Sequence, residues 1–426
     1  MASVIFNNNA NSSSVFQKTS MLPDKAFFDR VEKLVDKHNK LFAESNSLRF
    51  FSSPGRIELC GNHTDHQNGV VLCAAVNLDT LAVVNATNDS NIKISSDGYP
   101  IIEVDLNSLE QNTKEIGTST ALVKGVCKYF VDNGAKVGGF TACAHSNVFK
   151  GAGISSSASF ELLIASVLNS LYNDNALSET FTAKAAHFAE SVYFGKPCGL
   201  LDQCAIAFGS ICFIDFKSGE PNAQVVNAKL PLSVILVNTE GDHSELTNEY
   251  ASIRIEMNEV AKFFGKKVLR EIAPLDFKAN IPALRGKVSG RALLRAIHFF
   301  NEQERVTLAK HSLENGDINT FCNCINESGN SSLAYLQNCY PQPDTAQAIP
   351  SAVEVLRSLD GVKAARVHGG GFAGTVLALA ETDKLPKIKE VLDNVFGSEN
   401  YFVVDIRPTG ATEITKEINH DKHTTC

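Results

Sequence analysis

Residues 151–159 (GAGISSSAS) concentrate small and hydroxyl-bearing side chains where a ligand could approach the backbone closely. They follow an apolar segment with strand character, 139–148, and precede an apolar run with helical spacing, 160–171. Backbone N–H groups at the start of a helix point outward and favour an anion. Consecutive serines add hydroxyls that can bind phosphate oxygens or a metal ion. The stretch therefore predicts either a phosphate-binding loop or an ordinary Gly/Ser turn that ends in a serine N-cap.

A second polar stretch, residues 55–69 (GRIELCGNHTDHQNG), places Arg56, Glu58, His63 and Asp65 close together beside a β-rich segment. So dense a group of hydrogen-bonding side chains is typical of a ligand-binding loop, although a polar surface turn is the alternative. The HTDH pattern does not favour a metal site, because no third or fourth ligand follows at a suitable spacing.

Asp202 stands among apolar residues in the segment 196–209 (KPCGLLDQCAIAFG). A carboxylate in such a setting costs free energy unless a partner offsets its desolvation. Pairing with an arginine would explain it, as would a deliberately placed acid. The alternative is a helix N-cap before QCAIAF, which is the commoner use of an aspartate at such a point.

Composition limits the class of protein. The 426 residues carry a net charge of -8, which argues against a broad nucleic-acid-binding surface, and no apolar run is long enough for a membrane span. Residues 1–22 lack the pattern of a secretory signal and are expected to form a flexible leader. The 11 cysteines show no CxxC pair, so we expect free thiols in a reducing, cytoplasmic setting.

The elements expected to position these residues alternate between helices and strands. Apolar periodicity and turn residues predict strands at 48–60 (two pieces around a Ser-Pro-Gly turn), 70–79, 81–85, 92–95, 101–104, 139–148, 210–216, 232–238, 362–368, 375–380 and 401–407. Helices are expected at 23–45, 119–133, 160–171, 178–195, 246–264, 285–315, 318–336, 348–359 and 384–396. Within these, 291–305 has the mixed pattern of a surface helix.

Five segments together resemble one family. Residues 54–69 are similar to the first signature of the GHMP small-molecule kinase superfamily, in the form that marks the sugar loop of the galactokinase family. Residues 151–159 resemble its phosphate-binding signature, and HGGGFAG at 368–374 resembles its third signature, a glycine turn. CGLLDQ at 198–203 and RPTG at 407–410 are similar to further galactokinase elements. The order and spacing of the set make the resemblance specific.

The resemblance implies an α+β fold of two domains with the active site between them. Residues 23–218 would form an N-terminal ribosomal-protein-S5-like domain that binds sugar and ATP, and residues 219–415 a ferredoxin-like C-terminal domain. The implied activity is transfer of the γ-phosphate of ATP to the C1 hydroxyl of galactose, with Mg²⁺ bridging the phosphates. Sugar and ATP are the expected partners of a cytoplasmic monomer that binds neither nucleic acid nor membrane.

By the same resemblance, Asp202 is the catalytic acid–base group and Arg56 the arginine beside it. An acid within hydrogen-bond reach can orient a sugar hydroxyl and accept its proton, and an arginine would keep that acid ionised. The other implied roles are sugar contacts at Asn62, His63, Asp65, Gly199 and Tyr250, ATP contacts at Gly151, Gly153, Ser155, Ser156 and Ser157, metal ligands at Ser156 and Glu190, and a structural turn at Gly369, Gly370 and Gly371.

One departure from the family pattern concerns the sugar loop, which usually reads GEHTD and here has Asn62 in place of the glutamate. The family's glutamate contacts the hydroxyl on carbon 6 of the sugar. A neutral amide could hold that hydroxyl and would also tolerate a carboxylate there, which leaves galacturonate open as a substrate. A silent, galactokinase-like sugar sensor is a further alternative, although the complete serine loop and the presence of Asp202 and Arg56 favour catalysis. Kinases of mevalonate or homoserine fit less well.

Overall fold

The computed structural model describes residues 25–148, 153–196, 198–239, 246–341, 344–372 and 374–418. The leader expected at 1–22 and the predicted ATP contact Gly151 lie outside these residues. Among the described helices, none combines the length and the apolar character needed to cross a membrane.

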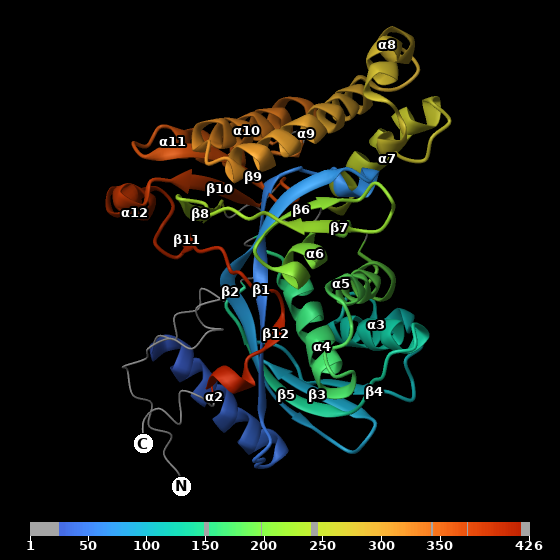
Figure 1. Cartoon of the computed structure of the whole chain (residues 1–426), viewed down its shortest axis with the longest axis vertical. Coiled ribbons are helices and arrows are strands. Elements are labelled where there is room, and N and C mark those ends of the chain that lie inside the picture. Colours follow the sequence, from blue (N-terminus) through green and yellow to red (C-terminus); the bar gives the residue numbers. More distant parts are fainter. Residues whose placement is uncertain are drawn as a thin grey trace.

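The first sheet is built on two long antiparallel strands, β1 (Arg49–Cys60) and β2 (Val70–Ala86). Its strand order is β12-β1-β2-β5-β3-β4. The first residues of β2 also pair with β6, and β6 pairs with β7. The other members are β3 (Asn91–Ser96), β4 (Ile102–Asp105), β5 (Phe140–Ser146), β6 (Ile211–Asp215), β7 (Asn222–Val225) and β12 (Thr412–Glu413). In Figure 1, β1 and β2 run from the lower part of the molecule up to the level of the second sheet.

The turn expected at Ser-Pro-Gly within 48–60 is wrong, because β1 is one continuous strand. Pro54 pairs with Asp79 and Gly55 with Val76, so the register shifts between them and β2 carries the extra residues. Such an irregularity tolerates a proline inside a strand, because the missing N–H falls where the ladder is already interrupted. The two strands expected at 70–79 and 81–85 are likewise one strand, β2.

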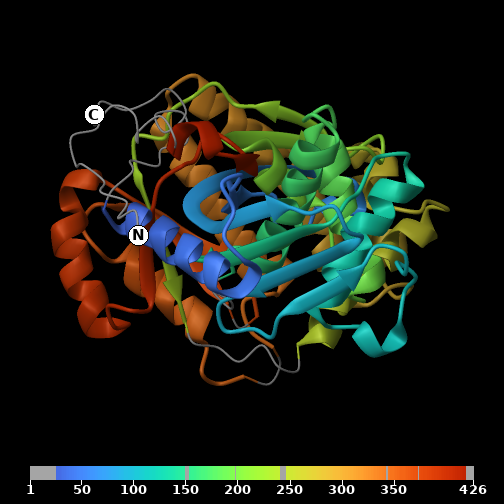
Figure 2. The ribbon, with the colours of Figure 1, turned by 90° about the horizontal axis from the view of Figure 1, so that it is seen from below.

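Alternate side chains of the first sheet face different helices, as the period of a β-strand requires. Helix α2 (Lys25–Phe42) lies across one face, where Phe27, Val31 and Leu34 pack with Phe50, Leu81, Val83 and Cys143 (Figure 2). On the opposite face, Phe51, Ala82, Val84 and Ala142 pack against α3 (Ser119–Asp132), α4 (Ser156–Tyr172) and α5 (Glu179–Phe188).

The second sheet has the order β11-β8-β10-β9 and is wholly antiparallel. Its strands are β8 (Ser233–Asn238), β9 (Val362–His368), β10 (Thr375–Ala380) and β11 (Tyr401–Val404). One face packs against α11 (Ala348–Arg357) and α12 (Leu385–Val395). The other face turns its alternate residues, Val234, Leu236, Leu377 and Leu379, towards the first sheet.

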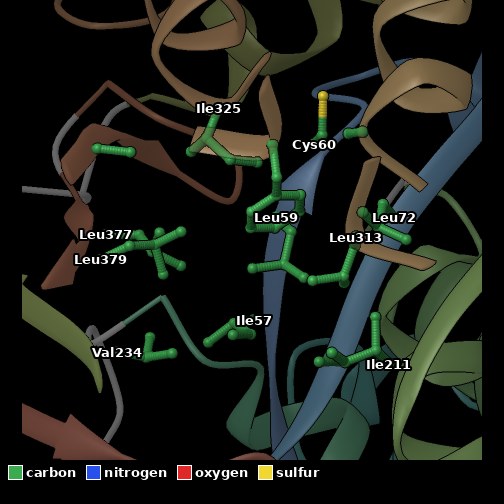
Figure 3. Packing of buried hydrophobic residues seen from close by; sticks show 14 of the residues in the cluster. Ile57, Leu59, Cys60, Leu72, Ile211, Val234, Leu313, Ile325, Leu377 and Leu379 are labelled. Atoms are coloured by element: carbon green, nitrogen blue, oxygen red, sulfur yellow. The ribbon is translucent and has the colours of Figure 1, made fainter. Parts of the chain in front are cut away.

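A shared apolar core joins the two halves of the chain. Ile57 and Leu59 of β1 lie in one cluster with Leu377 and Leu379 of β10, and the helices α9 (Gly290–Glu314) and α10 (Ile318–Ser331) close it with Leu313 and Ile325 (Figure 3). Because residues far apart in the sequence fill this one core, the two halves are held in a fixed relation around β1.

Two expectations about the C-terminal half need correction. The boundary drawn after residue 218 falls inside the β6–β7 hairpin of the first sheet, and β12 returns to pair with β1. The segment 291–305 is not a surface helix, because Arg295, His298 and Glu302 on α9 are completely buried. The remaining elements are α6 (Leu201–Phe208), α7 (Thr247–Phe263), α8 (Pro274–Leu284), the 3₁₀ turns Asp65–Gln67, Thr113–Glu115, Leu269–Glu271 and Thr382–Lys384, and the π-helical turns Ala189–Tyr193 and Ser332–Leu336.

Candidate active site

Asp202 meets Arg56 and Ser155 where β1, α4 and α6 converge. The Nε and Nη2 atoms of Arg56 each lie 2.7 Å from Asp202 Oδ1. Ser155 donates its hydroxyl to Oδ2 of the same carboxylate. Asp202 lies in the first turn of α6, whose N-cap is Leu200, so the predicted Asp–Arg pair is confirmed and the N-cap alternative is wrong.

The surroundings of Asp202 favour its ionised form. Burial would raise the pKa of this carboxyl, but the charges of Arg56 and Lys196 and the hydrogen bond from Ser155 hold it below the usual value. The side chain keeps 32% of its surface exposed, so a ligand can still reach it. A carboxylate that is ionised, fixed in position and accessible can orient a hydroxyl and accept its proton.

The start of α4 is open towards the same carboxylate. Ser155 is the N-cap residue, with a left-handed backbone at φ 62°, and its side chain does not cap the helix because it is committed to Asp202. The N–H groups of the first turn are therefore left without a side-chain cap, which suits an anion. Gly153 also has a positive φ, 66°, and a Cβ there would lie 2.8 Å from Thr375 Oγ1. Only glycine fits this approach between the loop and β10.

Glu190 lies beside this loop, in the π-helical turn Ala189–Tyr193, and is 2% exposed. Its Oε1 accepts from Ser157 Oγ and Lys196 Nζ, both at 2.8 Å, and its Oε2 accepts from Gln203 Nε2 at 2.8 Å. Ser156, the serine predicted as a metal ligand, has no hydrogen bond to Glu190 in this structure, and its neighbour Ser157 does.

The residues around Glu190 fit a magnesium ion that is held mainly by a nucleotide. A carboxylate and serine hydroxyls are hard oxygen donors, and a cation, the Lys196 ammonium, already lies against the carboxylate. No group of three or more His, Cys, Asp or Glu side chains able to hold a metal occurs in the parts of the chain that the structure covers. Magnesium commonly binds through one or two carboxylates together with substrate phosphates, which matches this donor set.

The loop between β1 and β2, residues 61–69, is called the sugar loop after the family pattern. It contacts both α6, the helix of Asp202, and the glycine turn at 369–371. Asp65 Oδ2 accepts from the backbone N–H of Leu201, next to Asp202, at 3.4 Å. Gly199 is packed so tightly here that a Cβ would lie 1.6 Å from Asp65 Oδ2. Burial raises the pKa of Asp65 and lowers that of His63, and the attraction between the two opposes both shifts. His63 and Asp65 thus interact electrostatically with each other, and Asp65 also with Asp202.

The glycine turn after β9 is held by side chains at each of its carbonyl groups. Asn62 Nδ2 donates to Gly369 O at 2.7 Å, and His63 Nε2 donates to Gly370 O at 3.0 Å. Tyr250 on α7 donates its hydroxyl to Gly371 O at 2.9 Å. The turn is itself confined: Gly369 and Gly371 have φ of 64° and 83°, and a Cβ on Gly370 would meet the Tyr250 ring at 2.5 Å. Residues 369–371 thus form a tight turn, and its supporting role in the site stays a prediction.

Asn62 does not have the free amide that the sequence led us to expect. It is 1% exposed, and its Nδ2 donates to Glu58 Oε2 at 3.1 Å as well as to Gly369 O. Its Oδ1 accepts from Asn338 Nδ2 at 2.7 Å and from Ser332 Oγ at 3.2 Å. Both donors and both acceptor positions are therefore filled by the protein, and this side chain has none left for a sugar. The inference that Asn62 contacts carbon 6 is corrected accordingly.

Sequence reasoning missed the residues of α9 that hold the sugar loop from behind. His298 Nε2 donates to Asn62 O at 2.9 Å, and Glu302 Oε1 accepts from the Gly61 N–H at 3.0 Å. Arg305 and Ser328 also bind Glu302, and its pKa is lowered to about 2 because these partners, with His298, outweigh its burial. The signal was present as polar residues four apart, since positions i and i+4 share one helix face.

Comparison with known proteins identifies the family of this chain. Residues 36–86 match the family model described as galactokinase galactose-binding signature, and residues 121–210 match that of the GHMP kinases N-terminal domain. A Clostridium tetani protein named galactokinase is 30% identical over 85% of this chain and 92% of its own. The human protein of the same name is 31% identical over 84% and 91%.

Solved structures share the fold. The crystal structure of Lactococcus lactis galactokinase complexed with galactose superposes with a TM-score of 0.80, over 90% of this chain and 99% of that one, at 24% identity. A mevalonate kinase, outside the sugar branch, is more distant: the L. major structure has a TM-score of 0.59 over 86% of this chain and 97% of its own, at 16% identity. The fold is that of the GHMP kinases, and the chain belongs to the galactokinase family.

Proposed function

We propose that this protein is an ATP-dependent galactokinase that transfers the γ-phosphate of ATP to the C1 hydroxyl of galactose, giving galactose 1-phosphate and ADP. Relatives matched over more than nine-tenths of their own length carry the name galactokinase, and the matched solved structure is described as complexed with galactose. The observation that carries the proposal is the Asp202 carboxylate between Arg56 and Ser155, at the open start of α4.

In this proposal Asp202 orients the C1 hydroxyl and accepts its proton as the phosphoryl group is transferred. Arg56 keeps Asp202 ionised, and its guanidinium, fixed by Gly153 O, can also offset charge that develops on the transferring group. Both functions need the pair to be held rigidly, and the contact of β1 with α6 and the phosphate loop supplies that rigidity.

We assign the nucleotide phosphates to the start of α4, with Gly153 and the hydroxyls of Ser155, Ser156 and Ser157 as contacts. Gly151 is part of the same proposal, although it lies outside the described residues. Glu190 with Ser156 or Ser157 would hold Mg²⁺, which would supply charge neutralisation of the phosphates when it is bound. Of the two serines, Ser157 is the one that already bonds to Glu190.

We assign the sugar to the space bounded by His63, Asp65, Gly199 and Tyr250 next to Asp202. Buried polar groups of this kind discriminate strongly between sugars, since a missing hydroxyl would leave them unpaired. Asn62 is left out of the contact set and given a supporting role, because its amide is filled. The case for galacturonate depended on a free amide at Asn62, so this geometry removes its physical basis.

A cytoplasmic monomer stays the prediction for location and assembly. The ten cysteines in the described part of the chain are all free thiols, which supports a reducing compartment.

The test is a screen of purified protein with ATP, Mg²⁺ and a panel of hexoses that includes galactose and galacturonate. Galactose should be turned over, and Asp202→Ala should abolish transfer while ATP binding, measured by calorimetry, stays largely intact. Turnover of no sugar would favour a silent sensor. An active Asp202→Ala enzyme would refute the role given to that residue.

A further inference from the structure

Lys196 makes contacts that the proposed mechanism does not use, beside the proposed phosphate loop (residues 153–157). It lies in the loop between the π-helical turn Ala189–Tyr193 and α6, and its backbone N–H donates to Glu190 O at 3.1 Å. Its Nζ reaches back to Glu190 Oε1 at 2.8 Å. The lysine side chain is 58% exposed, whereas the glutamate is almost completely buried. A long cationic arm, much of it in solvent, therefore covers a fixed, buried carboxylate.

The three donors to Glu190 differ in kind. Ser157 and Gln203 are neutral and belong to helices, so they can stay in place when the site fills. The ammonium is the charged donor, and it sits on a flexible stem with three rotatable N–H groups. Glu161 lies beside Glu190 with both carboxyl oxygens unpartnered, and burial followed by the charge of Glu190 raises its pKa well above the usual value. Of the three donors, Lys196 alone brings a positive charge to Glu190.

Lys196 also acts on the catalytic carboxylate. Its charge is among the causes that lower the pKa of Asp202. Although desolvation opposes it, the charges of Glu190 and Asp202 hold the pKa of Lys196 above its usual value. The ammonium thus contacts the proposed metal ligand, Glu190, and its charge also acts on the carboxylate of Asp202.

We propose that Lys196 is a tethered cation that changes partners: its ammonium balances Glu190 while the site is empty, turns to the phosphates of a nucleotide that binds without metal, and leaves Glu190 to a divalent cation when one binds. The inference rests on the proposed kinase function, in which nucleotide phosphates lie at the start of α4. Lysine is suited to both positions because it binds a carboxylate and a phosphate alike as a point charge.

Removal of Lys196 should change the affinity for metal-free nucleotide and the affinity for the metal in opposite directions. In this proposal Lys196 lends a mobile positive charge to the phosphates before metal binds, so its removal should weaken metal-free nucleotide binding. Lys196 also competes with the divalent cation for Glu190, so its removal should make metal binding easier. The ratio of the ADP dissociation constant in EDTA to that in Mn²⁺ should therefore rise in the variant.

The experiment is calorimetric titration of ADP into the full-length protein, once in EDTA and once with saturating Mn²⁺. For Lys196→Met we expect this ratio to rise about tenfold or more. Lys196→Gln, which keeps a hydrogen-bond donor for Glu190 without the charge, should behave in the same way and guards against a folding defect. Lys184→Met is the matched control, since Lys184 pairs with the exposed Glu220 at 2.7 Å and its loss should leave the ratio unchanged.

A purely structural role for Lys196 would weaken ADP binding equally in both arms and leave the ratio as in the wild type, which would overturn the proposal. A lower ratio would overturn it as well. If the wild type binds ADP and phosphorylates galactose while the ratio does not respond, the inference about Lys196 fails and the proposed function stands. If the wild type binds no ADP, both fail.

Discussion

Asn62→Asp is the substitution that tests the reinterpretation of the sugar loop most directly. The change is isosteric and replaces one NH₂ group by an oxygen. That oxygen would face the Glu58 carboxylate at 3.1 Å and the Gly369 carbonyl at 2.7 Å, both of which can only accept. The two contacts on the other side of the amide, from Asn338 and Ser332, would be kept.

The cost can be worked out from these contacts. Two buried acceptors lose their donor, at about 1–3 kcal/mol each. Repulsion between the new carboxylate and Glu58 is relieved when one of the pair binds a proton, as happens when carboxylates share a site. Together these give a loss of about 3–5 kcal/mol in the free energy of unfolding at pH 7.

Denaturant unfolding of Asn62→Asp between pH 5 and pH 8 measures this loss. Because a protonated carboxyl can donate again, the loss should shrink as the pH falls. In a double-mutant cycle Glu58→Gln should couple favourably to Asn62→Asp, since the amide that it introduces can donate to the new carboxylate. Asn169→Asp is the matched control: the Asn169 amide donates to Leu177 O at 3.1 Å, far from Glu58, so Glu58→Gln should not couple to it.

A loss below about 1 kcal/mol that does not change with pH would refute the view that Asn62 is filled by the protein. So would the absence of coupling to Glu58, because the double-mutant cycle isolates that contact. Either result would make Asn62 a candidate sugar contact again, and galacturonate would again be an open substrate.

Other predictions concern the remaining parts of the site. Arg56→Gln should move the acidic limb of the kcat/KM profile for galactose to higher pH, because burial then raises the pKa of Asp202 without the arginine to oppose it; an unmoved limb would contradict the pairing. Gly199→Ala should raise the KM for galactose at least about tenfold with little change in that for ATP, since the new methyl group displaces Asp65; an unchanged KM for galactose would count against it. Glu302→Gln should cost about 2–4 kcal/mol at pH 7, measured by urea unfolding. Because the folded pKa is depressed to about 2 from 4.5, this deficit should fall away as the pH drops through that window; a constant deficit would argue against an ionised Glu302.

The sequence predicted best what short segments determine. Helices such as α3 and α12 and strands such as β9 and β10 were located by their apolar period, and the Asp–Arg pair followed from one acid in an apolar setting. Family motifs added the glycine turn. These features depend on residues that are close in the sequence or on motifs that occur together in one family.

What sequence reasoning missed depends on long-range packing. Pro54 and Gly55 predict a turn locally, but β2 absorbs them in a register shift that only the paired strand reveals. Glu302 and His298 look like the polar face of a surface helix, yet that face covers the sugar loop of the other half of the chain. The same holds for Asn62, whose four partners come from β1, the glycine turn and the segment after α10.

The arrangement around the glycine turn gives the first and third motifs one physical function. Asn62 and His63 each donate to a carbonyl of that turn, and Asn338 donates both to Asn62 and to Gly370 O at 3.1 Å. The turn therefore binds the sugar loop through its carbonyl acceptors. The same contacts fix the position of His63 and of Tyr250. Because each of these contacts is a single hydrogen bond of about 1 kcal/mol, the set holds the loop firmly only as a whole, and losing one member should loosen sugar binding before it unfolds the protein.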